Sequence, residues 1–368
     1  MTGDGSPADA RQPRGPRLLA LGYFVVLALL ILFGITAVLF GDPRAGEPVL
    51  HFAMPEIAQK IAAVPVVPQA GAANAAPQPG QNPGDVVPPP AIVPATISQR
   101  IYAGRALVAD PALIEATPNG PLPRIGADGT PPLRAYAGVT LDTGRPRIAI
   151  VIGGLGISAK MTSAALASLP PGVTLSFAPY ASDVQRWVAE ARREGHEVLL
   201  EVPMEPFDFP DSDPGPHTLR SGVGEDANTE RLVWALTRFT GYTGVTNLLG
   251  GRLMSDSDSL EPVMTYLSRR GLLFYDNGTA SHSAAPDVAA RTGTPFAQAT
   301  ATIDKIETAM EIDRELSELE SEARAHGSAS GAGFLHPVTV DRVRQWAQSL
   351  PGRGFVLVPA SAIVAPKK

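Results

Sequence analysis

The stretch Arg147-Ile-Ala-Ile-Val-Ile-Gly-Gly-Leu-Gly156 decides the fold class of this 368-residue chain. Its uninterrupted apolar run, Ile148–Ile152, is typical of a strand that is buried on both faces, as strands of parallel sheets are. Glycines follow at the point where the strand ends, so the next loop begins with backbone and no side chain. The stretch therefore predicts a central parallel strand followed by a loop without functional groups at its first two positions.

Seven similar runs follow, separated by amphipathic stretches that predict helices. This alternation favours an α/β fold with a parallel sheet. The predicted strands are Ile148–Ile152, Val173–Phe177, Glu197–Val202, Gly244–Leu249, Leu272–Asp276, Phe296–Ala299, Gly331–Leu335 and Phe355–Pro359. The predicted helices are Ser182–Glu194, Thr229–Phe239, Glu261–Arg270, Asp304–His326 and Thr339–Leu350, and they place Trp187 and Trp234 at buried positions.

The N-terminal region predicts a membrane anchor. Residues 18–40 carry no charge, and a helix of that length covers about 35 Å, enough for a hydrocarbon layer of roughly 30 Å. A cleaved signal peptide is the alternative, but its apolar core is shorter, about 7–15 residues. Because Arg11, Arg14 and Arg17 precede the span, we expect residues 1–17 in the cytoplasm and the remainder outside. In a Gram-negative cell this is an inner-membrane protein with a periplasmic C-terminal domain.

Residues 41–96 form the predicted linker. Between Pro65 and Pro94 the chain is rich in Pro, Ala and Gly, a composition that builds an extended spacer rather than a packed core; a Pro-rich ligand for a partner protein is the alternative. The net charge of −6 argues against a nucleic-acid partner, and the chain has no cysteine and hence no disulfide.

From Pro146 onward the chain resembles the divergent polysaccharide deacetylases. The motifs that carry the resemblance are Pro203-Met-Glu-Pro206, Asp213-Pro-Gly-Pro216, Gly244-Val-Thr-Asn247 with Gly250 and Arg252, and Leu357-Val-Pro-Ala-Ser-Ala362. The resemblance implies a distorted (β/α) barrel over residues 146–368, with its active face at the carboxyl ends of the strands. It also implies that residues 97–145 form an arm packed on this domain.

Two family motifs lack their metal-binding side chains here. Gly153 and Gly154 stand where the family motif reads Asp-Asp, and Leu248 stands where Asn-Asn-His-Met-Gly-Ser-Arg supplies a histidine. Neither glycine nor leucine has a lone pair to offer a metal ion. We therefore expect no metal cofactor. A relocated zinc site built from Asp276, His282 and His336 is the alternative.

The remaining polar positions at strand ends are the candidate site residues. If the domain is active, Glu205, Asp276 and His336 match the family positions that would carry the chemistry. Each also has a structural interpretation: Glu205 as a cap or ion-pair partner, the other two as hydrogen-bonding groups. The candidate binding residues are Gly153, Gly154, Glu201, Asn247 and Arg252. The other histidines, His51, His196, His217 and His326, are expected at the surface.

Three functions are consistent with this sequence. The first is a membrane-anchored pseudoenzyme that binds a cell-wall glycan or an envelope protein in the former active cleft. The second is an active carbohydrate N- or O-deacetylase with relocated metal ligands. The third is a structural scaffold that recruits partners through its Pro-rich segment. A metal analysis separates the first two, because only the second requires a bound ion.

Overall fold

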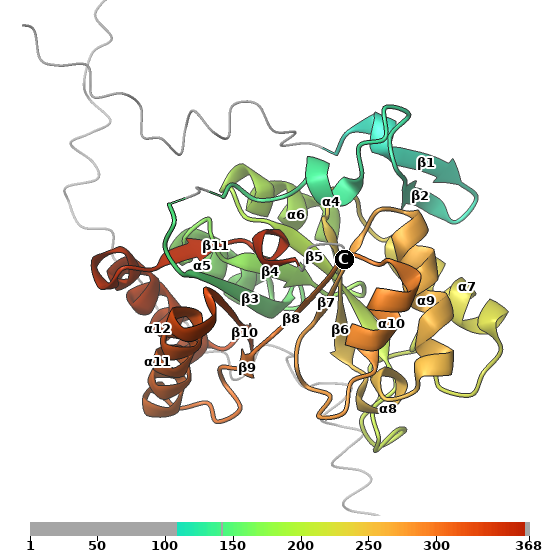
Figure 1. Cartoon of the computed structure of the whole chain (residues 1–368). Helices are drawn as coiled ribbons and strands as arrows, with labels where there is room; N and C mark the ends of the chain where they lie inside the picture. Colours follow the sequence, from blue (N-terminus) through green and yellow to red (C-terminus); the bar gives the residue numbers. More distant parts are fainter. Residues whose placement is uncertain (1–108, 141–142, 365–368) are drawn as a thin grey trace, which may run out of the picture. The chain divides into compact units, whose positions relative to one another are not determined.

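The computed structural model describes residues 109–140 and 143–364, which all belong to one compact unit (Figure 1). The predicted anchor at residues 18–40, the linker at residues 41–96 and the beginning of the arm lie outside the described residues. Among the helices that the structure describes, none combines the length and apolar character needed to cross a membrane.

Nine strands form one sheet in which every pairing is parallel. They are β3 (Arg147–Leu155), β4 (Thr174–Phe177), β5 (Val198–Met204), β6 (Gly244–Leu249), β7 (Leu273–Asp276), β8 (Phe296–Gln298), β9 (Ala301–Thr302), β10 (Ser328–Phe334) and β11 (Val356–Val358). The order is β8-β7-β6-β5-β4-β3-β10-β9, with β11 beside the first residues of β3.

The two edges of this sheet meet through the chain itself. Strands β8 and β9 lie at opposite ends of the strand order, yet only residues 299 and 300 separate them. The Ala299 N–H donates to Asp276 O at the end of β7, and the Thr300 N–H donates to Ser330 O on β10. Since so short a link spans only about 10 Å, the sheet must curl until its edges are adjacent. The fold is therefore a parallel α/β barrel whose last seam is covalent rather than a ladder of hydrogen bonds.

All eight predicted strands are present, and β9 was not predicted because two residues carry no periodic signal. The five predicted helices are also present, with shifted ends, and α5, α8 and α10 are additional. The helices are α5 (Ala159–Ser168), α6 (Val184–Arg193), α7 (Glu225–Leu236), α8 (Gly251–Met254), α9 (Ser257–Arg269), α10 (Ala285–Thr292), α11 (Ala309–His326) and α12 (Pro337–Ser349). Figure 1 shows them outside the curled sheet, with α11 beside α12 and α9 beside α10.

The buried apolar residues form two clusters. The larger one lies between the sheet and the helices and includes Trp187, which is 6% exposed as predicted. Trp234 is only partly buried, contrary to the prediction, because its indole stacks on the His217 ring at 3.7 Å, near the surface. The smaller cluster fills the barrel interior and includes Val151, Leu199 and Tyr275.

His196 corrects another expectation: it is buried rather than at the surface. Its Nδ1–H donates to the carbonyl of Val173 at 2.8 Å, and burial lowers the pKa of the imidazole. His326 is exposed as predicted and pairs with Glu322, and His51 lies outside the described residues.

The described part of the arm packs on the amino-terminal side of the sheet. It contains the hairpin β1 (Ile114–Thr117) and β2 (Gly120–Pro123) and the short helix α4 (Pro132–Ala135). Arg270 pairs with Glu115 at 2.7 Å and donates to the Pro123 carbonyl. Further along the arm, the Gly138 N–H donates to Oε2 of Glu197, at the start of β5.

Candidate functional site

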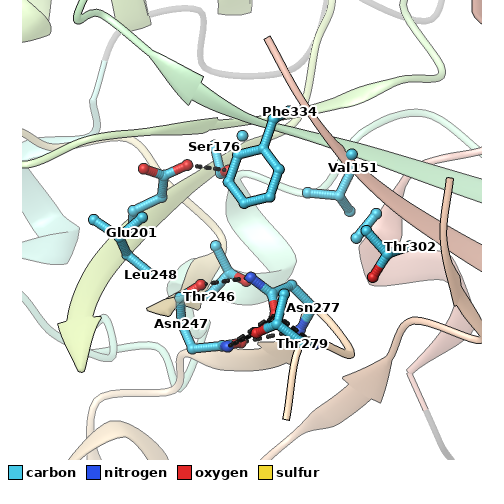
Figure 2. A pocket seen from close by; sticks show the side chains of 13 residues that line it. Val151, Ser176, Glu201, Thr246, Asn247, Leu248, Asn277, Thr279, Thr302 and Phe334 are labelled. Atoms are coloured by element: carbon cyan, nitrogen blue, oxygen red, sulfur yellow. Dashed lines mark hydrogen bonds between the residues drawn. The ribbon is translucent and has the colours of Figure 1, made fainter. Parts of the chain in front are cut away.

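A small cavity lies at the carboxyl ends of the strands, where a barrel enzyme carries its active site (Figure 2). Its volume is about 20 Å³, room for about one water molecule. The wall combines polar groups, such as those of Glu201 and Thr246, with apolar side chains that include Leu248 and Phe334. The lining residues are Val151, Gly153, Ser176, Glu201, Thr246, Asn247, Leu248, Asn277, Thr279, Thr302, Ala332, Gly333 and Phe334.

Glu201 brings a carboxyl group into this cavity. It lies in the middle of β5 with its side chain on the interior face, and only 3% of the residue is exposed. Oε1 accepts hydrogen bonds from the Gly154 N–H at 2.6 Å and from the Ser176 hydroxyl at 3.0 Å. Burial raises the pKa of Glu201 to about 7, because removal from water disfavours the charged form more than these two bonds favour it.

Gly153 explains how this carboxyl group fits. A Cβ atom at position 153 would lie 2.7 Å from Oε1 of Glu201 and 3.2 Å from the Ser176 hydroxyl oxygen, too close for both neighbours to stay in place. The Glu201 oxygen thus lies against the space that a side chain at position 153 would enter. A carboxyl group from β5 therefore lies beside the two glycines of β3.

Two asparagines join the ends of β6 and β7. The side chain of Asn247 accepts from the Asn277 N–H at 3.0 Å and donates to the Asn277 side-chain oxygen at 2.8 Å. In return, the Asn277 amide donates to the Asn247 carbonyl at 2.7 Å. Both residues line the cavity, but these bonds use most of their polar atoms. Asn247 therefore shapes the wall more than it offers groups to a ligand.

The residues next to Asn247 keep an unusual backbone. Leu249 has a φ of 57°, a left-handed conformation that a bulky residue rarely adopts, and its carbonyl accepts from the Asn247 amide at 2.8 Å. The bend directs the Leu248 side chain into the wall of the cavity, where the related motif places a histidine. The loop therefore places Leu248 at the cavity, and a leucine side chain cannot bind a metal ion.

Glu205 and Arg252 lie together outside the cavity. Glu205 is 4% exposed; it accepts from the Ser221 N–H at 2.7 Å and pairs with the Arg252 guanidinium at 3.6 Å. Its carbonyl accepts from the backbone N–H groups of Arg252 and Leu253. These contacts give Glu205 a supporting role in two loops, whereas the Arg252 side chain is 55% exposed and can reach a ligand beside the cavity. Neither residue is tested as a binding or catalytic group, so those roles stay predictions.

The structure does not assemble the alternative metal site. Asp276 is fully buried and accepts from the Gly278 N–H at 2.9 Å and from the Gln298 amide at 3.2 Å, and burial raises its pKa. His336 precedes α12, and its Nε2 lies 3.3 Å from Glu307. His282 is exposed. Across residues 109–140 and 143–364, no three His, Cys, Asp or Glu side chains gather as a metal ion requires. The described residues therefore do not fit the metal ion of the deacetylase mechanism.

Several cavity residues were not predicted from the sequence. Ser176, Thr246 and Thr302 are single hydroxyl groups in strands, and Phe334 ends β10. The signal that was present is the alternation of the strands: Ser176 and Glu201 both lie on interior faces. Their mutual contact depends on the register between β4 and β5, which the sequence does not reveal.

Comparison with known proteins agrees with this architecture. The model of the divergent polysaccharide deacetylase family matches residues 150–364. The uncharacterized protein YibQ of Escherichia coli (strain K12) is 27% identical over 219 residues, 59% of this chain and 67% of that protein. An uncharacterized protein of Haemophilus influenzae is 25% identical over 205 residues, 56% of this chain and 72% of that protein. The crystal structure of an uncharacterized protein from Agrobacterium tumefaciens C58 superposes with a TM-score of 0.66 at 41% identity, covering 67% of this chain and 100% of that one.

The matched range is more than half of the chain, and it contains every strand of the barrel at least in part. The chain belongs to the divergent polysaccharide deacetylase family.

Proposed function

We propose that this protein is a metal-independent glycan-binding member of its family, held at the cell envelope by residues 18–40. The observation that supports it best is the cavity wall at the family's metal position. There Gly153 offers backbone, Leu248 offers a hydrocarbon side chain, and the carboxyl of Glu201 fills the remaining space. What is left is a pocket with a few hydroxyl groups among apolar side chains, a mixture that is typical of small-ligand sites.

Sugar recognition also agrees with the family. A domain built like a polysaccharide deacetylase suggests a polysaccharide as ligand. The exposed guanidinium of Arg252 and the half-buried ring of Phe334 lie near the carboxyl ends of the strands and add a donor group and an apolar face to such a surface. The alternative ligand is an envelope protein. Absence of glycan binding in the experiment would favour this alternative.

The location is part of the proposal. The uncharged segment 18–40, preceded by three arginines, supports an inner-membrane anchor with the barrel in the periplasm. Protease added to spheroplasts is then expected to digest the barrel domain. Digestion only after the membrane is permeabilised would contradict this orientation.

Binding itself is tested with the purified full-length protein in detergent. We expect chitotetraose, an oligomer of N-acetylglucosamine, to bind in calorimetry with the same affinity before and after treatment with EDTA. Phe334→Ala is expected to weaken binding several-fold, because its ring borders the cavity. The matched control is Phe207→Ala, a ring that is 66% exposed and does not line the cavity.

Three outcomes count against the proposal. Absence of binding to chitotetraose and to a panel of other envelope glycans would reject the glycan. Binding that disappears with EDTA would show a metal-dependent site. Release of acetate from the acetylated sugar would establish a deacetylase with ligands outside the family motif.

A further inference from the structure

Two polar groups at the cavity lack a hydrogen-bond partner among the described residues. The hydroxyl of Thr246 is fully buried and has no hydrogen-bond partner in the described protein, although the residue is only 2% exposed. The second group is Oε2 of Glu201, because both hydrogen bonds to this carboxyl from described residues end on Oε1. A buried hydroxyl without a partner costs about 1–3 kcal/mol. Such a group indicates a ligand or a water that the site is built to hold.

The two residues that carry these groups are neighbours in the sheet. Glu201 on β5 and Thr246 on β6 are register partners in the parallel ladder, and both side chains line the cavity. In Figure 2 Glu201 lies beside Leu248, and Thr246 lies lower in the view beside Asn247. The free volume is about 20 Å³, so one oxygen-sized group of a ligand fits and a whole sugar ring does not.

The protonation of Glu201 determines what it offers. Around it, Gly153 and Gly154 approach from β3, Ser176 from β4 and Thr246 from β6, and none of these residues carries a charge. Burial places the pKa of the carboxyl at about 7, so near neutral pH a large share of the molecules carry the proton. Since Oε1 accepts two hydrogen bonds, the proton belongs on Oε2, which becomes a donor.

We propose that protonated Glu201 and Thr246 together bind a single hydroxyl group of the glycan, a step that rests on the proposed glycan-binding function. The sugar oxygen accepts from Oε2 of Glu201, and the sugar O–H donates to the Thr246 hydroxyl. A hydroxyl satisfies both partners at once because it is donor and acceptor. An ether or carbonyl oxygen only accepts, so it could pair with both groups only if the Thr246 hydroxyl donated as well.

Two isosteric variants test the pair. Thr246→Val removes a hydroxyl that has no internal partner, so we expect the unfolding midpoint to stay the same or rise while chitotetraose affinity falls at least tenfold. Thr246→Ser, which restores a hydroxyl, is the matched control. Glu201→Gln mimics the protonated acid, because its amide oxygen can accept from Gly154 and Ser176 while its NH₂ donates.

The pH profile separates this inference from the broader function. Wild-type affinity for chitotetraose is expected to fall as the pH rises through about 7, whereas Glu201→Gln keeps its affinity from pH 6 to pH 8.5. If wild type binds but Thr246→Val and Glu201→Gln behave like it at every pH, the glycan function stands and this inference is overturned. If the wild type binds chitotetraose at no pH, both the proposed glycan-binding function and this inference are wrong. A marked loss of stability in Thr246→Val would show that its hydroxyl serves an internal water instead, which also overturns the inference.

Discussion

Two buried glutamates, one just before β5 and one in its middle, have opposite surroundings. Glu197, just before the strand, accepts hydrogen bonds from the Gly138 N–H, from the N–H and hydroxyl of Ser361, and from Thr174. Glu201, four residues later on the same face, accepts only from Gly154 and Ser176. The first carboxyl joins the arm, the sheet and the C-terminal segment, and the second faces a cavity.

This difference separates a part of the sheet where side chains stabilise the fold from a part where they line the candidate site. At the amino-terminal end the Glu197 carboxyl links three parts of the chain by hydrogen bonds, so a substitution of Glu197 is expected to reduce stability. At the carboxyl-terminal ends of the strands lie the left-handed residue Leu249 and the paired asparagines. Gly153 and Leu248 line the cavity there, and neither has a side chain that can bind a metal ion.

The largest effect is expected at the amino-terminal end. Glu197→Ala removes the acceptor of the Ser361 N–H and hydroxyl and opens a cavity, so we expect the free energy of unfolding to fall by about 4 kcal/mol. Glu201→Ala, which removes two bonds beside an existing cavity, should cost less than half of that. Urea denaturation of both variants measures the difference. Equal losses of unfolding free energy would show that Glu197 and Glu201 contribute equally to stability.

The pH dependence of stability is the next largest effect. The pKa of Glu201 is raised to about 7 in the folded protein from 4.5. The stabilisation from its bound proton is therefore complete below about pH 4.5 and is lost as the pH rises to about 7. The upper bound is roughly 3 kcal/mol, at about 1.4 kcal/mol per pKa unit. We expect wild type to lose stability relative to Glu201→Gln over this window. Parallel curves for the two proteins would place the pKa of Glu201 near its ordinary value.

A smaller effect tests whether one carboxyl has replaced another. Gly153→Asp forces a side chain against Oε1 of Glu201 and is expected to destabilise the fold by about 2 kcal/mol. In a Glu201→Ala background the same substitution should cost at least 1 kcal/mol less, which a double-mutant cycle measures. Additive losses would mean that the two positions do not compete for the same space.

The sequence predicted the strands of the barrel better than the contacts of its site. Short apolar runs such as Ile148–Ile152 indicated the buried strands, and all eight predicted strands are present with small shifts at their ends. Helix α5 was missed because its Ala- and Ser-rich sequence has little amphipathic contrast. His196 was expected at the surface, since no local pattern shows that its Nδ1–H donates a hydrogen bond to the Val173 carbonyl.

The candidate site shows the same division. The substitutions Gly153 and Leu248 were visible in the sequence because flanking motif residues fix their positions. The contacts between Glu201 and Gly154 and between Glu201 and Ser176 join residues 47 and 25 positions apart. They depend on register and curvature of the sheet, which no local pattern specifies.

The central claim is that the barrel keeps the family scaffold without a catalytic metal site. It is tested most directly by measuring zinc and acetate together: full-length protein is incubated with zinc, separated from unbound ion, analysed for metal and assayed with acetylated chitotetraose. The account predicts far less than one zinc per chain and no acetate release, in wild type and in His336→Ala alike. Zinc bound one per chain and lost in Asp276→Ala or His336→Ala, together with acetate release by wild type, would contradict it.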